Sequence, residues 1–228
     1  MAGERNRTAL RPLPSRRSAH FILQTIGEQP YERLEREALQ RLEKWYRRYR
    51  IQFEVQPPDP MAVLLYPRPA FHNLTGAPAW ADGEYDGKGV LRVATSGGAR
   101  MDDNLERILA HELAHAFIEA RSSGKAPRWL QEGLAQYLAP HTVASAAPLP
   151  AGMTLNALDH AGSLGFIRAL IQRHGLAALM DVLAALSQGM SQDEGFRRVT
   201  GLTARAQFIR WRAGHPLAPA AASGKGGP

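Results

Sequence analysis

The chain contains no cysteine among its 228 residues. Without cysteine it can form no disulfide, it carries no thiol nucleophile, and it cannot hold an iron–sulfur cluster or a cysteine-ligated zinc finger. Any metal ion that the protein binds must therefore be held by histidine and carboxylate side chains.

The sequence also lacks an uninterrupted apolar run of the roughly 18 to 20 residues that a membrane-spanning helix needs. Its arginine-rich start, residues 1–17, is not followed by the apolar segment of a secretory signal. We therefore expect no membrane span and a cytoplasmic protein, or a secreted or envelope-associated one if the natural N-terminus differs. The 44% share of hydrophobic residues is enough to fill a core.

Acidic residues are outnumbered mainly at the start of the chain. The formal net charge is +7. Residues 1–50 hold 12 Lys and Arg against 6 Asp and Glu, a net charge of +6, whereas residues 51–228 hold 16 against 15, a net charge of +1. A surface that follows a nucleic-acid backbone needs cations across the folded part of the chain. We therefore expect no nucleic acid as the main partner.

The apolar periods that are present predict short strands first and helices afterwards. Strand-like apolar or alternating segments occupy residues 20–25, 61–66 and 89–95. Asp103 and Glu106 are typical of a helix N-terminus, and Ser191 with Glu194 forms a capping box. The segments with a helical period are residues 30–49, 102–121, 127–138, 160–174, 176–186 and 203–212.

This order predicts an α+β fold in one domain, residues 18–213. We expect a small mixed β-sheet lobe at residues 18–98 and an all-helical lobe at residues 102–213. The tails, residues 1–17 and 214–228, show no apolar period and are expected to be disordered. No pattern in the sequence assigns an oligomeric state.

One helical segment contains the sequence HELAH, residues 111–115. Residues four apart lie on the same side of a helix, one turn apart, so the imidazoles of His111 and His115 can reach one metal ion. Glu112 projects roughly 100° away from His111 and is placed to contact a water molecule on that ion. The alternative is a pair of half-exposed histidines on an ordinary helix. The apolar face around the pair favours a metal, because buried imidazoles need partners.

A catalytic zinc ion needs a third protein ligand and one open position for water. Since cysteine is absent, this ligand must be another histidine or a carboxylate from a different element. Glu132 follows His115 by seventeen residues, in the segment WLQEGLA, residues 129–135. Asp159 and Glu119 are the other carboxylates to consider.

Together, HELAH and WLQEGLA resemble the motifs of the gluzincin metallopeptidases, specifically the bacterial peptidase-MA-like family. The resemblance extends loosely over residues 18–213. It implies a gluzincin, thermolysin-like catalytic fold with one catalytic zinc ion (Zn2+), held by His111, His115 and Glu132, and with Glu112 as the general base. It also implies a peptide or protein substrate that pairs along the sheet edge at residues 89–95.

The chain departs from this family at two positions. Gln136 stands where the family often has an acid, and its side chain either accepts a hydrogen bond from a ligand histidine or is a solvated helix residue. His160 stands where related chains often have a tyrosine that stabilises the oxyanion. It either takes over this catalytic role or is an exposed histidine at the start of a helix.

We therefore expect a zinc metallopeptidase in which Glu112 and His160 are the catalytic side chains. A catalytically inactive zinc-binding pseudo-peptidase, acting as a protein-binding or scaffold domain, is the alternative. A third hypothesis is a protease associated with DNA. It is weakened because such families tend to use a third histidine and a cysteine-type zinc ribbon, which this sequence lacks.

Overall fold

The computed structural model describes residues 11–27, 31–97, 100–142 and 152–214. The chain divides into two compact units. Unit 1 comprises Met1–Ala120 and Leu138–Thr142, and unit 2 comprises Arg121–Tyr137 and Val143–Pro228. All strands that the described residues form belong to unit 1, and unit 2 is helical, so the predicted α+β class is confirmed.

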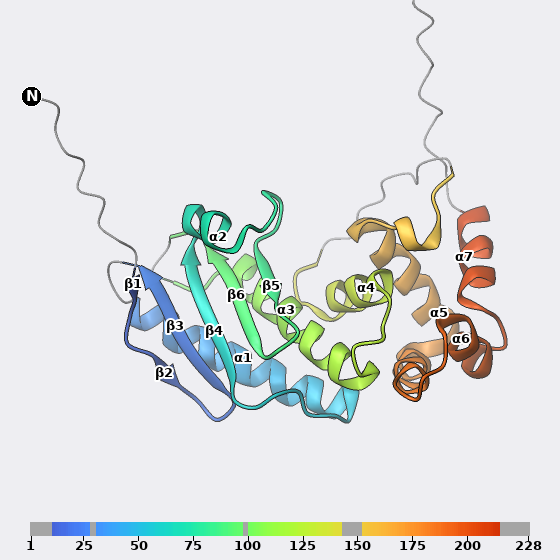
Figure 1. Ribbon diagram of the computed structural model, residues 1–228, viewed down its shortest axis with the longest axis horizontal. Helices are drawn as coiled ribbons and strands as arrows, with labels where there is room; N and C mark the ends of the chain where they lie inside the picture. Colours follow the sequence, from blue (N-terminus) through green and yellow to red (C-terminus); the bar gives the residue numbers. More distant parts are fainter. Residues whose placement is uncertain (1–10, 28–30, 98–99, 143–151, 215–228) are drawn as a thin grey trace, which may run out of the picture. The chain divides into compact units, whose positions relative to one another are not determined.

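Unit 1 is built on a mixed sheet of six strands (Figure 1). The strand order is β1-β3-β4-β6-β5, and β2 also pairs with β3. The central strands β3, β4 and β6 are parallel, whereas β1, β2 and β5 are antiparallel to their neighbours. The strand bounds are Arg11–Pro12 for β1, Arg16–Arg17 for β2, Phe21–Gly27 for β3, Met61–Pro67 for β4, Gly83–Tyr85 for β5 and Val90–Thr95 for β6.

The three long strands match the expected segments, but β6 is not the edge of the sheet. Strand β5 pairs with it, placing Gly83 opposite Val93 and Tyr85 opposite Leu91. The expectation that a peptide pairs along residues 89–95 is therefore wrong for the outer side of that strand, because β5 already occupies it. The sequence did not reveal β5, since three residues in a Gly- and acid-rich segment show no period.

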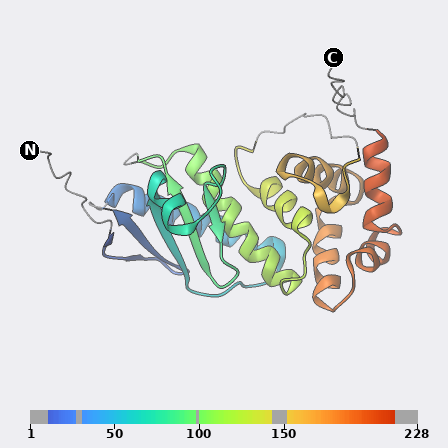
Figure 2. The same ribbon diagram turned by 45° about the horizontal axis from the view of Figure 1, so that its top comes forward.

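Successive side chains of a strand point to opposite faces of the sheet, and helices cover both faces (Figures 1 and 2). One face carries side chains such as Phe21, which packs edge-on against Tyr46 of helix α1 (Glu32–Phe53). The other face carries Tyr66, which packs against Phe71 of helix α2 (Arg68–Thr75). Helix α2 was not expected, because its eight residues are too few to show a helical period.

Helix α3 (Asp103–Ser122) belongs to the α1 side of the sheet. Its Phe117 contacts the rings of Tyr46, Tyr49 and Phe53 on α1. This packing explains why residues up to 120 cluster with the sheet, although the sequence places them in a separate helical lobe. The division between the units falls inside α3.

The N-terminal cap of α3 differs by one residue from the expectation. The backbone N–H of Leu105 donates to Oδ1 of Asp102 at 2.7 Å, so Asp102 rather than Asp103 caps the helix. Glu106 is not the reciprocal acid of a capping box, because its Oε1 accepts a hydrogen bond from Nε1 of Trp45 at 3.0 Å. A buried indole N–H needs such a partner, and this need outweighs the local motif.

Unit 2 consists of helices around an aromatic core (Figure 1). Trp129 packs against Phe166 and Phe196, and Phe166 in turn contacts Phe208 and Trp211. The expected helices all occur: α4 (Arg128–Leu138), α5 (His160–Ser187), α6 (Gln192–Thr200) and α7 (Ala204–Ala213). The last residue of α4 belongs to unit 1. A short 3-10 helix, η1 (Leu155–Ala157), precedes α5.

Two local expectations in unit 2 are confirmed. The capping box of Ser191 and Glu194 is present at α6. Helix α5 is interrupted at Gly175, which has a φ of 80° and ψ of 159°, so its two halves correspond to the two expected segments. Helix α5 is also long and apolar enough to cross a membrane by length and composition, a test that the core helix of a soluble protein passes equally.

The N-terminal tail is ordered from residue 11 onward, contrary to expectation. Strands β1 and β2 both pair with β3, and Leu13 between them is buried. Nε of Arg16 lies 2.6 Å from Oε2 of Glu35, a carboxylate that is only 2% exposed. A buried carboxylate needs a cation, and no local pattern indicates this long-range pair. Residues 1–10 and 215–228 lie outside the described residues.

Candidate metal centre

The two histidines of HELAH lie on α3, in unit 1. Their Nε2 atoms are 3.1 Å apart and their rings are nearly perpendicular, at 84°. Two nitrogens that bind one tetrahedral zinc ion at about 2.0 to 2.1 Å are about 3.3 Å apart. The observed separation is close to this value, so the pair fits a shared ion. Both side chains are half-buried.

Glu112 lies beside this pair and is buried, with 6% of its surface exposed. Strand β5 passes directly against it. A Cβ atom added to Gly83 would lie 2.7 Å from Oε1 and 2.9 Å from Cγ of Glu112, and 2.8 Å from Cγ2 of Ile108. Gly83 is therefore required for the close approach of β5 to α3, and it limits the positions that the Glu112 carboxylate can take.

Further acidic and phenolic groups lie along the same strand. Burial, with the nearby carboxylates of Glu119 and Asp86, raises the pKa of Tyr85 to about 12, so its hydroxyl stays protonated at neutral pH. Burial and the charge of Asp86 raise the pKa of Glu119 above its usual value. A Cβ atom on Gly87 would lie 3.2 Å from Oε1 of Glu119, so this carboxylate packs on the turn between β5 and β6.

In unit 2, the structure brings Glu132 and His160 together. Oε2 of Glu132 on α4 lies 3.0 Å from Nε2 of His160 at the start of α5. The hydrogen bond to Glu132 raises the pKa of His160 above its usual value, against the opposing effects of burial and of the Arg128 charge. His160 is thus more than an exposed helix residue, because it contacts the carboxylate that the sequence assigns to the metal.

Gln136 makes two contacts that the sequence did not indicate. Its Nε2 donates to the backbone oxygen of His160 at 2.8 Å and to that of Glu132 at 3.3 Å. The side chain therefore connects α4 to the first residue of α5. An acid at this position could not make these bonds, because both acceptors are carbonyl oxygens.

His111 and His115 of unit 1 and Glu132 of unit 2 are side chains of the kinds that bind a metal ion. Two imidazoles and one carboxylate form a donor set that suits zinc. Asp159, the other carboxylate considered in unit 2, accepts a hydrogen bond from the backbone N–H of Gly162 at 2.7 Å and caps α5.

Gly83 is a residue beside the site that the motifs did not indicate. It lies in the turn-rich connection before β6, where glycines are ordinary, and only the contact with Glu112 gives it a role. No signal in the sequence alone could have separated it from Gly87 or Gly89.

Comparisons with known proteins give a limited result. No protein-family model matches the chain, and no curated protein matches it. Two crystal structures of the M1 zinc metallopeptidase from Deinococcus radiodurans are similar, with 18% sequence identity and a TM-score of 0.48 for one and 17% and 0.46 for a mutant. Each match covers 92% of this chain, which spans about half of the enzyme chains, 52% and 53%.

Proposed function

We propose that the chain is a zinc-dependent metallopeptidase of gluzincin type, which hydrolyses peptide bonds. The observation that carries this proposal is the pair of Nε2 atoms of His111 and His115, 3.1 Å apart on α3. His111, His115 and Glu132 are the proposed ligands, and Glu112 and His160 are the proposed catalytic side chains.

Bound zinc supplies Lewis acidity, which lowers the pKa of water and polarises a peptide carbonyl. Glu112 is the proposed general base: its carboxylate takes a proton from the attacking water and delivers it to the leaving amine. Burial and the contact with Gly83 support this role, because they hold the carboxylate in a restricted position.

His160 has two roles in this proposal. Through its contact with Glu132 at 3.0 Å it orients the ligand carboxylate. As an N–H donor it also stabilises the negative charge that develops on the substrate oxygen. The first role predicts weaker zinc binding in His160→Phe, and the second predicts a lower kcat with little change in KM, so the two are separable by measurement.

The substrate is a peptide or protein segment in this proposal. Strand β5 is the place where an extended peptide would add to the sheet, because β5 is paired with β6 on one side and ends the described strand order. The peptide backbone would then run past Gly83 and beside the carboxylate of Glu112.

The competing function is a zinc-binding scaffold without turnover. It is favoured by the same contact of His160 with Glu132, because this contact gives His160 a role in holding the ligand that needs no turnover. Both functions require the metal, and only turnover distinguishes them.

Metal analysis tests the ligand set. The purified wild type should hold about one zinc ion, and His115→Ala and Glu132→Ala should lose most of it, because a site with two ligands binds far more weakly. Full zinc content in Glu132→Ala would show that Glu132 is not the third ligand, and Glu119 and Asp159 would be substituted next.

Cleavage of a mixture of unfolded protein and peptides, followed by mass spectrometry, tests catalysis. Glu112→Gln should retain zinc and lose at least about 100-fold in turnover, as expected from the loss of a general base. Equal inactivity of wild type and Glu112→Gln, with zinc in both, would favour the scaffold. Equal and appreciable activity would refute the role of Glu112.

A further inference from the structure

A hollow of about 460 Å³ lies at the start of α4, within unit 2. It is formed by the loop before α4, the first turn of that helix, η1 and the first residue of α6. Pockets of this size accommodate small ligands or single side chains of a bound peptide. The lining residues are Lys125, Pro127, Arg128, Trp129, Asn156 and Gln192.

The lining of this hollow is basic. It includes two cations, Lys125 and Arg128, and no carboxylate. Among the ion pairs that the structure describes in unit 2, none includes either cation. Nζ of Lys125 donates to the backbone oxygen of Ser187 at 3.1 Å, which positions the ammonium group without neutralising it. Two cations that form no described ion pair favour an anion.

The amides of the hollow add donors. Nε1 of Trp129 donates to Oε1 of Gln192 at 3.2 Å. Because Trp129 is buried and this bond uses the amide oxygen, Gln192 presents its NH₂ group as the other end of the side chain. Asn156 contributes a second amide. The lining thus includes two cationic and two amide side chains, all of which can donate N–H hydrogen bonds to a carboxylate.

The hollow begins one helical turn from the proposed metal ligand. Arg128 and Glu132 are four residues apart on α4, so they lie on the same side of the helix, with Cβ atoms roughly 5 to 6 Å apart. If Glu132 holds the metal ion at which the peptide bond is cleaved, a residue of the peptide next to that bond comes within reach of Arg128.

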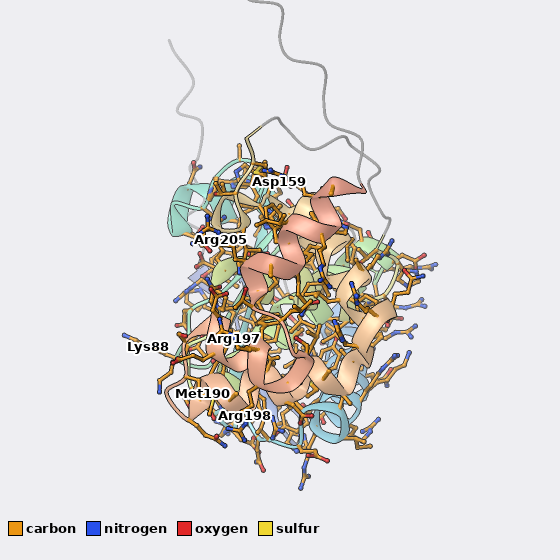
Figure 3. All side chains as sticks on the ribbon, turned by 90° about the vertical axis from the view of Figure 1, so that its right-hand side faces the viewer. Lys88, Asp159, Met190, Arg197, Arg198 and Arg205 are labelled. Atoms are coloured by element: carbon orange, nitrogen blue, oxygen red, sulfur yellow. The ribbon has the colours of Figure 1, made fainter. Side chains whose placement is uncertain are left out.

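A second hollow in unit 2 does not share these properties. It is lined by Gln188, Gly189, Met190, Glu194, Arg197 and Arg198, several of which are labelled in Figure 3. It contains a carboxylate, Glu194, and Nη1 of Arg198 already donates to Oε1 of Gln188 at 3.2 Å. A lining rich in arginine is therefore not sufficient for an anion site. Of these two hollows, the one at α4 is better suited to an anion.

We propose that the hollow lined by Lys125, Arg128, Asn156 and Gln192 is a subsite for a carboxylate of the peptide substrate. This inference rests on the proposed function and names its substrate class: peptides with an acidic residue, or the C-terminal carboxylate, close to the cleaved bond. Charge-assisted hydrogen bonds to Arg128 and Lys125 should raise affinity for such peptides by roughly 10- to 100-fold.

Binding is measured by fluorescence anisotropy with labelled, amidated alanine-based heptapeptides. One Glu is moved through the sequence, each peptide is matched by one with Gln, and a further peptide has a free C-terminus. The zinc-loaded full chain carrying Glu112→Gln prevents cleavage. We expect a 10- to 100-fold lower Kd for the Glu peptides at one or two positions, or for the free C-terminus, which identifies the source of the carboxylate.

Adding Arg128→Gln should remove this difference, whereas Arg205→Gln should preserve it. Arg205 is a matched control, because it is an exposed arginine on α7 of the same unit and lines neither hollow (Figure 3). Equal Kd values for all peptides, or a preference that survives Arg128→Gln, would overturn the subsite.

Cleavage assays separate this inference from the proposed function. If the wild type cleaves Glu and Gln peptides with equal kcat/KM, or if Arg128→Gln lowers both equally, the subsite is refuted and the peptidase stands. If no peptide is cleaved while the Arg128-dependent binding preference persists, the subsite stands and the peptidase is refuted.

Discussion

Gly133, directly after Glu132, determines how closely α4 approaches α5. A Cβ atom at this position would collide with Cγ1 of Ile167 and lie 2.6 Å from the backbone oxygen of Ser163. A side chain can move away, but a backbone oxygen inside a helix moves only with the helix. The glycine of the WLQEGLA segment therefore allows the helix contact that supports Glu132 and His160.

Gly133→Ala should lower the free energy of unfolding by about 1 to 3 kcal/mol, the usual cost of overpacking a core. Gly195→Ala is the control: it is also a buried helix glycine in unit 2, but its Cβ would meet Ala185 at an ordinary 3.5 Å. Chemical denaturation measures both. A Gly133→Ala protein as stable as the control would show that the two helices separate at no cost.

Glu43 makes the stability of unit 1 sensitive to acid. Oε1 accepts hydrogen bonds from Oγ of Ser18 at 2.7 Å and from the backbone N–H of His20 at 2.9 Å, and Nδ1 of His20 lies 2.8 Å from Oε2. Burial raises the pKa of Glu43, but these hydrogen bonds outweigh burial and hold the pKa below its usual 4.5. The folded protein therefore binds the proton at Glu43 less tightly than the unfolded chain.

The stabilisation from Glu43 is fully present above about pH 4.5 and is lost as the pH falls through its lower folded-state pKa. Glu43→Gln should destabilise the protein at pH 7 by about 1 to 3 kcal/mol and flatten the decline in stability below pH 4.5. Denaturation between pH 3 and 7 checks this, with the exposed Glu32→Gln as control. Parallel pH profiles for wild type and Glu43→Gln would contradict it.

At the scale of single residues, the motifs identified those site residues whose spacing depends only on nearby sequence. HELAH placed His111, Glu112 and His115 on one helix, because helical spacing depends only on nearby sequence. The partners of His160 and Gln136 could not be predicted, since both contacts join α4 to α5 across 24 or more residues. Such contacts depend on tertiary packing, which a single sequence does not reveal.

At the scale of elements, β5 and α3 form a close contact within unit 1. The strand has only three residues, and its middle residue, Glu84, contacts Arg92 of β6 through an ion pair of 2.9 Å. Pairing with β6 and this ion pair hold β5 in register, and Gly83 then lies against Glu112. The position of the proposed base thus depends on a neighbouring strand.

Gly83→Ala should lower kcat by roughly 100-fold, because a displacement of about 1 Å at a reacting group costs that much. Zinc content should remain, since Glu112 is not among the proposed ligands. Gly27→Ala is the control: it adds the same methyl group near the end of β3, where its Cβ would lie 4.0 Å from Thr25. Unchanged kcat in Gly83→Ala would show that Glu112 tolerates the methyl group and is not held by β5.

The elements predicted from the sequence are those with several turns or a long apolar run. The strands β3, β4 and β6, the helix α1 and the helices from α3 onward all have this property. The missed elements, β1, β2, β5, α2 and η1, have between two and eight residues. Contacts with the rest of the fold, rather than their own sequence, stabilise such short elements, so no local period identifies them.

At the scale of the whole molecule, the charge distribution has a structural basis. Helix α1 carries five exposed cations between residues 41 and 50: Arg41, Lys44, Arg47, Arg48 and Arg50. Arg41 and Lys44 lie 3.4 and 3.9 Å from the carboxylate of Glu106. Residues 32–50 of this helix hold seven Lys and Arg against four Glu, a net charge of +3, so part of the basic excess of residues 1–50 is carried by an ordered helix.

Zinc binding should stabilise the folded chain as a whole, since a ligand that binds only the native state shifts the unfolding equilibrium. With free zinc at 1,000 times its Kd, the gain is about 4 kcal/mol. For a chain of this length, that corresponds to a melting temperature roughly 8 to 16 °C higher. Chelation should remove this increment, and added zinc should restore it, as measured by differential scanning fluorimetry.

The same measurement on two variants separates the proposed ligands from the proposed base. Glu112→Gln should keep the full zinc-dependent shift in melting temperature, because Glu112 is assigned to the proton and not to the metal. Glu132→Ala should lose most of the shift, because its remaining ligands are the two histidines of α3. An equal shift in wild type and Glu132→Ala would mean that zinc is held without Glu132, and the proposed metal centre would be wrong at its third ligand.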